Sequence, residues 1–533
     1  VWVFRGFVAA LLPPLIGALV IFGGFLAVGL LNTLTPISVY ALNLVIGLSL
    51  GLAIDYSLLV VSRYREEIAA GEPGRAALER TLHTAGRSVV FSAVPVAAAL
   101  AGLMVFPQPF LFSMGIGGEG GGLIAATGAG LVLPAVLALL GRRVNAWAPR
   151  RWRAQNELAH ERATSGFWVR LSHAVMRRPI PVATLTAVAL IAVALPAFDI
   201  TFTSVDARAL PASVDARAVS DRLASEFPQA HADPISVALS APTGGPEARG
   251  VRRELADYAS ALAATPGAVA VERPVPVGAD RWRIDVYGDA PALSPAGQDL
   301  VAAVRAVPAP HPAALTGAAA SFSDQKASLG AHLPWAILVI AAATIIALFL
   351  MTGSLLLPIK AVIMNLLTLG ATLGLLVWIF EDGRFEGLFR YDSVDALDIT
   401  SPILLGAVAF GLATDYAVFL LSRIKEVHDT GADTPEAVAV GLQRTGRIIT
   451  AAALLFAVAI GAFVSSDILM VKELGFGTAV AVLIDATIIR ALLVPSLMVL
   501  LGRGNWWAPG PLRRLHERIG FAETAPPPRA GGG

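Results

Sequence analysis

Residues 51–63 read Gly-Leu-Ala-Ile-Asp-Tyr-Ser-Leu-Leu-Val-Val-Ser-Arg, and residues 411–423 read Gly-Leu-Ala-Thr-Asp-Tyr-Ala-Val-Phe-Leu-Leu-Ser-Arg. Each copy ends an apolar run that is long enough to cross a bilayer, and each places an Asp-Tyr pair inside that run. A carboxylate at the centre of a bilayer costs about 2.5–3.5 kcal/mol on insertion scales, so a pair of them requires a reason. The candidate functional residues are Asp55, Tyr56, Asp415 and Tyr416.

Composition places the whole chain in the membrane class. Of its 533 residues, 56% are hydrophobic and only 15% are charged, whereas soluble domains carry about 25% charged residues. The chain contains no Cys, which excludes disulfides and thiolate metal sites. The net charge of +1 gives no reason to expect a nucleic-acid partner. We therefore expect a polytopic α-helical membrane protein without a cofactor.

Apolar runs divide the chain into two sets of spans separated by a polar domain. The predicted spans cover residues 7–31, 39–61, 88–106, 110–140, 179–198, 333–351, 358–380, 399–421, 448–464 and 474–501. Strand-like runs at 235–239 and 282–287 alternate with helix-like runs at 251–264 and 295–307, which predicts a small α+β domain outside the membrane.

The resulting organisation has six parts. They are a first span set with four full spans at 1–141, a basic linker at 142–178, a span at 179–198, the α+β domain at 199–330, a second set of five spans at 331–502, and a basic, then Pro/Gly-rich tail at 503–533. Arg-rich segments follow alternate spans and fall on one side, which the positive-inside rule assigns to the cytoplasm. The α+β domain and the acidic loop 381–398 then lie outside the cell.

The two Asp-Tyr segments belong to an internal repeat. Asp55 and Asp415 differ by 360 positions, as do Arg63 and Arg423 and the Gly-Arg pairs that begin at Gly86 and Gly446. Both copies run in the same direction, which indicates a parallel repeat about an axis along the membrane normal. Transporters place coupling-ion sites near the midplane at such interfaces. By the same repeat we expect an outer domain and two more spans upstream of Val1, so that the sequence is an N-terminally truncated piece.

The repeat suggests a chemistry for the four candidate residues. If the two Asp-Tyr helices pack together, each Asp can meet the Tyr of the other helix, and the site can load and release protons. The alternative is that the acids are solvated helix ends and the tyrosines are interface aromatics. Each Asp lies eight positions before its arginine, which at 1.5 Å per residue is roughly 12 Å of depth. That depth favours the proton relay.

Two further acids fall inside predicted spans. Asp485 is a candidate extension of the relay, with the alternative that Arg490, five positions on, pairs with it. Its repeat position is close to Ile124, so the halves differ there. Glu119 is a weaker candidate, which we place near the outer end of its span.

Other motifs are weak or absent. Gly115-Ile-Gly-Gly-Glu-Gly fits the dinucleotide-binding pattern, but it follows no strand and lies within a span, so we expect close helix packing there. No Walker A lysine motif is present. An intramembrane aspartyl protease would carry Tyr-Asp and Gly-x-Gly-Asp, whereas both sites here read Asp-Tyr.

The chain resembles the MMPL branch of the resistance-nodulation-division (RND) superfamily over nearly its whole length. The resemblance is carried by the segments at 51–67, 133–145, 351–362 and 410–416. It implies a twelve-span, proton-driven efflux protein of the cytoplasmic membrane that exports lipids or other hydrophobic or amphiphilic cargo. It also implies that Asp55, Tyr56, Asp415 and Tyr416 form the relay, that 199–330 has a porter fold, and that the chain is not an enzyme.

Some points stay open within the resemblance. A sterol-sensing receptor or a protein-export helper of the same superfamily is the alternative function, and the oligomeric state is monomer or trimer. The sequence also departs from the family pattern. The first outer domain and two spans are missing, the run at 115–122 is unusually rich in Gly, and no long cytoplasmic tail follows the last span.

Overall fold

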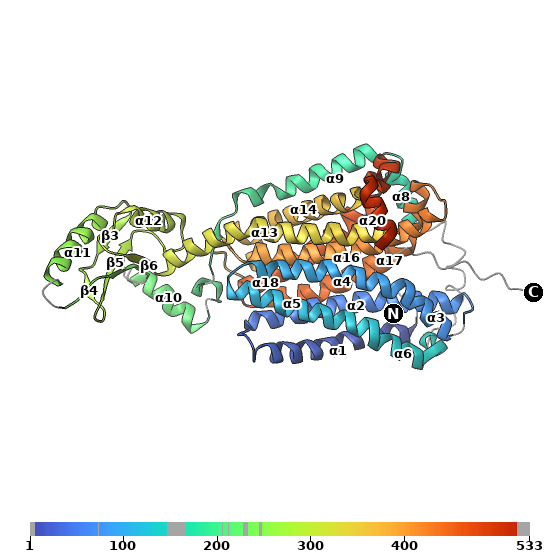
Figure 1. The fold of residues 1–533 in the computed structure, drawn as a ribbon, viewed down its shortest axis with the longest axis horizontal. Helices are drawn as coiled ribbons and strands as arrows, with labels where there is room; N and C mark the ends of the chain where they lie inside the picture. The colour runs from blue at the N-terminus through green and yellow to red at the C-terminus, as the bar shows by residue number, and fades with distance from the viewer. Residues whose placement is uncertain are drawn as a thin grey trace, which may run out of the picture.

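The computed structural model describes residues 6–72, 74–146, 167–204, 206–211, 213–226, 233–244 and 248–519. Most of the predicted basic linker and the tail after residue 519 lie outside the described residues. Within the described part, ten helical segments are long and apolar enough to cross a membrane by length and composition. They form a bundle, with the α+β domain at one end and the arginine-rich loops at the other (Figure 1). We call these the domain end and the basic end.

The first half of the bundle consists of six helices. They are α1 (Phe7–Leu31), α2 (Val39–Ala69), α3 (Gly74–Thr81), α4 (Arg87–Ala101), α5 (Pro109–Thr127) and α6 (Leu133–Leu140). Helix α2 continues eight residues beyond the predicted span end at 61. Arg63 lies within 3.3 Å of Glu66 and 2.8 Å of Glu67 at helical spacing, and such pairs support a helix after the apolar run has stopped.

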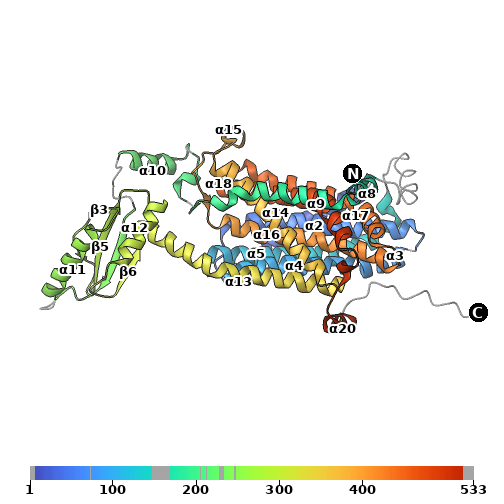
Figure 2. The same ribbon diagram turned by 90° about the horizontal axis from the view of Figure 1, so that it is seen from above.

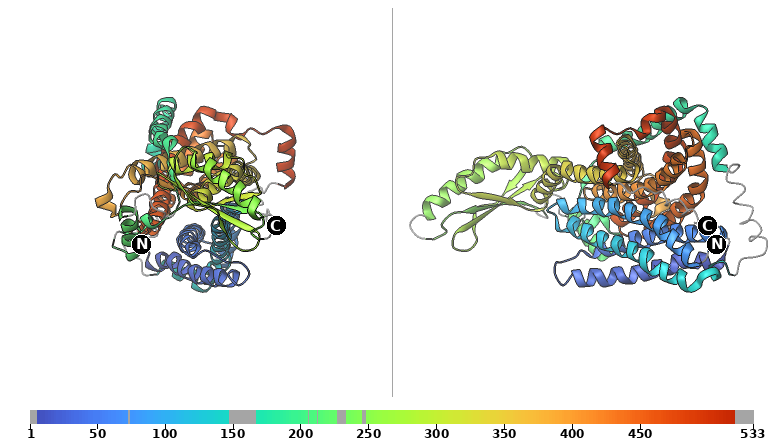
Figure 3. Two further views of the ribbon diagram at one scale, coloured as in Figure 1. Left: turned by 90° about the vertical axis from the view of Figure 1, so that its left-hand side faces the viewer. Right: turned by 45° about the vertical axis from the view of Figure 1, so that its right-hand side comes forward.

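The second half contains the helices of the basic linker, the remaining spans and the C-terminal segment. They are α8 (Phe167–Met176), α9 (Pro179–Ala194), α13 (Ala318–Thr352), α14 (Leu356–Leu376), α15 (Glu386–Phe389), α16 (Ser401–Asp429), α17 (Thr434–Gly461), α18 (Leu469–Ile484), α19 (Val494–Leu501) and α20 (Gly510–Ile519). The two halves lie side by side along the bundle axis (Figures 1 and 3).

Irregular helical turns recur at matching positions in the two halves. A π-helical turn, η3 (Gly128–Val132), joins α5 to α6, and η9 (Asp485–Leu493) joins α18 to α19. Each precedes a proline at the start of the next helix, Pro134 or Pro495. Proline cannot donate the usual backbone hydrogen bond, and a widened turn accommodates that loss. Each pair of helices is therefore one span with a built-in bulge, and the bulges belong to the repeat.

The α+β domain has an antiparallel sheet with strand order β3-β5-β2-β6 and with β4 beside β5. The strands are β2 (Ile235–Ser240), β3 (Ala268–Val271), β4 (Val275–Pro276), β5 (Arg281–Gly288) and β6 (Ala313–Thr316). Helices α11 (Ala248–Ala263) and α12 (Pro295–Ala306) pack on the sheet, and α10 (Asp215–Glu226) lies near the junction with the bundle (Figure 2). Val237, Ile284 and Val301 are fully buried in its core. The alternation of strand-like and helix-like runs was thus an adequate signal for this domain.

Two connections tie the domain to the bundle. Helix α13 begins at Ala318 and runs through the span without a break, whereas the sequence placed the span start at 333. The extra residues are rich in Ala, which favours helix even where the sequence is polar. Strand β1 (Phe202–Thr203) follows α9 and pairs in parallel with β7 (Leu397–Asp398). The chain entering the domain is therefore hydrogen-bonded to the segment that starts α16.

Candidate functional site

The two Asp-Tyr pairs lie inside the bundle, on facing helices α2 and α16. Asp55 is 4% exposed, Asp415 and Tyr56 are 0% exposed, and Tyr416 is 2% exposed. The Tyr416 hydroxyl donates to Asp55 Oδ2 across 2.7 Å. The structure therefore joins an acid of the first repeat to a tyrosine of the second, and neither faces lipid.

The complementary contact is open. The Tyr56 hydroxyl and both Asp415 carboxylate oxygens are buried without a hydrogen-bond partner in the described chain. Ser92 of α4 lies close enough to interact with both side chains, although its hydroxyl donates to the Val89 carbonyl at 3.1 Å. Leaving such groups unpaired is costly in a low-dielectric interior. The site is thus asymmetric, with one cross-repeat pair closed and one open.

Glycines let each relay helix approach the other half of the bundle. A Cβ added to Gly51 would lie 2.0 Å from ring carbons of Phe456 on α17, and one added to Gly411 would lie 3.4 Å from the Val96 Cα on α4. Gly51 and Gly411 are repeat partners, and so are Val96 and Phe456. The same interlock, a glycine of one half packed against a side chain of the other half, therefore occurs twice, and the contact between Gly51 and Phe456 is the closer one.

We predict that alanine substitutions at these two glycines have different effects. Gly51→Ala should lower the free energy of unfolding by about 1–3 kcal/mol, because the buried Phe456 ring must move to admit a methyl group. Gly411→Ala should be neutral or slightly stabilising, because its methyl group meets ordinary van der Waals contacts and alanine favours helix. Thermal unfolding of the two variants in detergent, with Gly51→Ala/Phe456→Val as the rescue, measures the difference. Equal destabilisation by both substitutions would contradict this account of the interlock.

Asp485 lies beside the relay and is paired. Arg490 Nε and Nη2 lie 2.9 and 2.8 Å from Asp485 Oδ2. Arg490 Nη2 also donates to the Ala413 carbonyl at 2.7 Å, and its guanidinium carbon lies 5.4 Å from the centre of the Tyr416 ring. The ion pair that the sequence left as an alternative is formed, and its arginine reaches α16 at the relay.

Two buried polar groups of the bundle, one beside the site and one at the domain end, were not selected from the sequence. Asn365 of α14 donates to Thr414 at 3.0 Å, next to Asp415. At the domain end of the bundle, Glu473 is 2% exposed and accepts a hydrogen bond from Ser401 at 3.0 Å. The predicted span began at 474, one position too late to include Glu473. The sequence signal that could have identified these groups was the presence of polar residues inside α14 and at the start of α18.

Glu119 and its glycine-rich segment lie within α5 (Pro109–Thr127). Glu119 lies ten residues into α5, roughly 15 Å from the helix start, which is deeper than the sequence placed it, and it forms no hydrogen bond or ion pair within the described chain. A Cβ at Gly121 would lie 2.2 Å from Ser49 Oγ, and one at Gly115 would lie 2.9 Å from the Leu100 carbonyl. The glycines therefore let α5 pack tightly on α2 and α4, and no phosphate-binding loop is formed.

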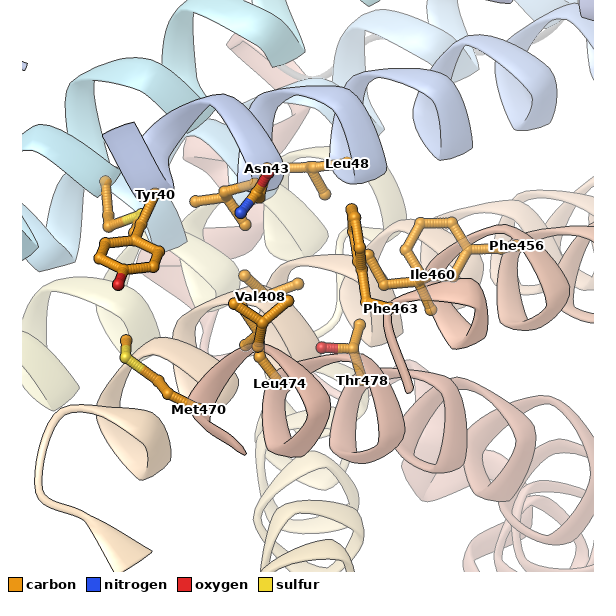
Figure 4. A pocket seen from close by; sticks show the side chains of 13 residues that line it. Tyr40, Asn43, Leu48, Val408, Phe456, Ile460, Phe463, Met470, Leu474 and Thr478 are labelled. Carbon is orange, nitrogen blue, oxygen red and sulfur yellow. The ribbon is translucent and has the colours of Figure 1, made fainter. Parts of the chain in front are cut away.

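A small cavity lies between the relay and the domain end, at the interface of the two repeats. Figure 4 shows Tyr40, Asn43 and Leu48 of α2 on one side and Met470, Leu474 and Thr478 of α18 on the other. Phe456, Ile460 and Phe463 complete the wall near Val408 of α16. Its volume is about 20 Å³, which is enough for about one water molecule. The Thr478 hydroxyl in its wall is buried and unpaired within the described residues, although most of the lining is apolar.

Comparison with known proteins identifies the family. The MMPL family model matches residues 1–182 and 208–527. SCO6666 of Streptomyces coelicolor is 40% identical over 99% of this chain and 71% of its own length. The trehalose monomycolate exporter MmpL3 of Mycobacterium tuberculosis is 36% identical over 98% of this chain and 58% of its own. The mycolic acid-containing lipids exporter MmpL11 of Mycolicibacterium smegmatis is 30% identical over 98% and 55%.

A solved structure supports the fold independently. SecDF in its super-membrane-facing form matches with a TM-score of 0.53 at 14% identity, covering 91% of this chain and 58% of that one. At that identity the likeness concerns the fold alone. The chain spans little more than half the length of the MmpL3 and MmpL11 relatives. With its ten candidate spans and its family match, the chain is a multi-pass protein of the cytoplasmic membrane that belongs to the MMPL family of the RND superfamily.

Proposed function

We propose that this chain is the proton-coupled core of an exporter of lipids or other hydrophobic or amphiphilic molecules. The observation that carries the proposal is the buried hydrogen bond from Tyr416 to Asp55 across the repeat interface. An acid held at the interface of the two repeats can change their packing when its charge changes. Intramembrane acids are functional by default, and transporters of this kind place coupling-ion sites at repeat interfaces.

The proposed cycle alternates between the two cross-repeat pairs. Ionised Asp55 accepts a strong hydrogen bond from the Tyr416 hydroxyl. Protonation of Asp55 weakens that hydrogen bond, because a neutral acid is a poorer acceptor. Asp415 and Tyr56, which are unpaired in this state, supply the matching contact in the other state. A proton that crosses 100 mV releases about 2.3 kcal/mol, which is sufficient to bias such a two-state packing. The proton is the coupling ion, and the proposal requires no other cofactor.

The cargo class rests on the relatives, whose names describe the export of mycolic acid-containing lipids and trehalose monomycolate. The cavity between the relay and the domain end has room for only about one water molecule, so we assign it to proton entry and not to cargo. The likeness to SecDF concerns fold alone and does not by itself favour a protein-export role.

Proton coupling predicts which energy source drives export. In membrane vesicles that contain the native full-length protein, an imposed gradient with acid on the domain side should drive export of radiolabelled lipid without ATP. A protonophore should reduce that export at least tenfold, because the relay acids can no longer be loaded and emptied in a directed way. ATP added together with the protonophore should not restore it. Export that ATP sustains after the gradient has collapsed would contradict the proposal.

A further inference from the structure

A second cavity lies on the basic side of the relay, inside the C-terminal half. It is bounded by α14, α16, η9 and the start of α19, and Ala413, Ala417, Leu420 and Leu421 of α16 form one wall. Its polar lining groups are Lys360, Asn365, Asp485 and Arg490, each at most 7% exposed. The volume is about 20 Å³, room for about one water molecule.

Lys360 is the least satisfied of these groups. Its Nζ lies 3.0 Å from the Met498 sulfur and 3.4 Å from Asn505 Oδ1, and it contacts no carboxylate in the described chain. Asn505 is fixed in that orientation, because its Nδ2 donates to the Met498 and Gly502 carbonyls at 2.7 and 2.8 Å. A thioether and one amide oxygen are poor compensation for a buried ammonium group, which is expensive without a counter-ion or water. Water in the cavity would supply the missing acceptor.

The cavity can hold such water because polar groups stand at both of its ends. Lys360 approaches η10 (Gly502–Trp506) at the basic end through Asn505. Asp485 and Arg490 stand at the other end, where Arg490 touches Tyr416 and the carbonyl beside the relay. A buried water needs two to four polar partners, and this lining offers them. The lining thus extends from the relay toward the basic surface.

Two of the four polar lining groups have no polar counterpart in the first repeat. With the one-residue slippage of this segment, Ile124 and Ala129 occupy the positions of Asp485 and Arg490. Arg65 donates to Asn145 at 2.6 Å, and Asn145 is the repeat partner of Asn505 with the same slippage-free offset of 360. The Asp485–Arg490 pair is therefore specific to the C-terminal half.

This inference rests on the relay proposed above. We infer that the cavity is the hydrated cytoplasmic half of the proton route, and that Lys360 is a positioning residue that holds water in it. A relay carboxylic acid loses its proton to a water molecule in the cavity, so that the O–H bond on the acid is replaced by one on water, and that water then releases a proton toward the basic end. No electrons are exchanged.

The absence of cysteine from this chain permits a direct test of hydration. Ala413→Cys places a thiol in the cavity wall, and Ala53→Cys places one at the repeat-equivalent position of α2, which is 0% exposed. Silver ion, added on the cytoplasmic side of inside-out vesicles, probes access at nearly the size of water. The Ala413→Cys thiol should react at least tenfold faster than the Ala53→Cys thiol, and adding Lys360→Met should slow it at least fivefold. Equal rates at the two positions would overturn the inference.

Proton flux tests the route apart from the relay. Ala417→Leu fills the cavity without removing a charge and should slow relay-dependent proton uptake at least tenfold, whereas Ile363→Phe, which adds volume on the exposed face of α14 outside the cavity, should leave it unchanged. Lys360→Arg should retain more flux than Lys360→Met. If Ala417→Leu conducts normally while Asp55→Asn does not, the route is wrong and the relay stands. If Asp55→Asn conducts normally, the relay and the route that rests on it both fail, whatever the silver result.

Discussion

Asp55→Asn is expected to abolish proton-driven export, with a loss of at least a hundredfold, while the protein still inserts and folds. Asparagine has the shape of aspartate, and its amide oxygen can still accept the hydrogen bond that Tyr416 donates to Asp55. It cannot take up or release a proton. The substitution therefore preserves the contact and removes the titration, which separates a relay from a structural hydrogen bond. Asp415→Asn should have the same effect, although Asp415 is unpaired in this structure.

A matched control exists on α16, the helix that carries Asp415. Asp429 at the basic end of α16 pairs with Lys425 at 2.8 Å, and its side chain is 40% exposed. Asp429→Asn should leave export within twofold of wild type, because exposed pairs contribute little. Export of labelled lipid is normalised to the amount of each variant in the membrane, and unfolding in detergent is measured alongside. Near-normal export by Asp55→Asn at normal abundance would rule out the relay.

Most of the fold was accessible from the sequence because hydrocarbon imposes a simple rule on the chain. The lengths of the apolar runs predicted the positions of the spans. The offset of 360 between Asp55 and Asp415, which other residue pairs share, revealed the repeat. The ends of helices were less accessible, because hydropathy reports where apolar side chains stop and not where hydrogen bonding stops. Helix α2 passes beyond its apolar run to Ala69, and α13 begins well before its own.

The sequence was sufficient to predict which residues form the candidate site, but not how they contact one another. Symmetry suggested that both Asp-Tyr cross pairs would form, yet only Tyr416 and Asp55 are bonded in the described chain. The two halves also pack differently beside these residues, since an added Cβ at Gly51 would lie much closer to Phe456 than one at Gly411 would lie to Val96. The reach of Arg490 to a backbone carbonyl on α16 likewise depends on how η9 packs against α16, which no local sequence pattern specifies.

The second large effect is expected at Arg490. Arg490→Met removes the charge and keeps much of the volume, and it leaves Asp485, which is 2% exposed, without its counter-ion. Breaking one partner out of a buried pair typically costs about 3–5 kcal/mol, whereas replacing both partners with uncharged side chains is often nearly neutral. Asp485→Asn/Arg490→Met should therefore recover most of the stability that Arg490→Met loses. Lys425→Met, which breaks an exposed pair on the same side of the bundle, should cost at most about 1 kcal/mol.

The double variant Asp485→Asn/Arg490→Met should recover stability without recovering export. The double variant regains a neutral interior but not the guanidinium that donates to the Ala413 carbonyl and lies over the Tyr416 ring. We therefore expect its export to remain at least tenfold below wild type although its unfolding in detergent is close to normal. If the double variant exported lipid at the wild-type rate, Arg490 would act only as the counter-ion of Asp485. If it exported poorly and was stable, the arginine would be acting on Tyr416 and hence on the pair that Tyr416 closes with Asp55.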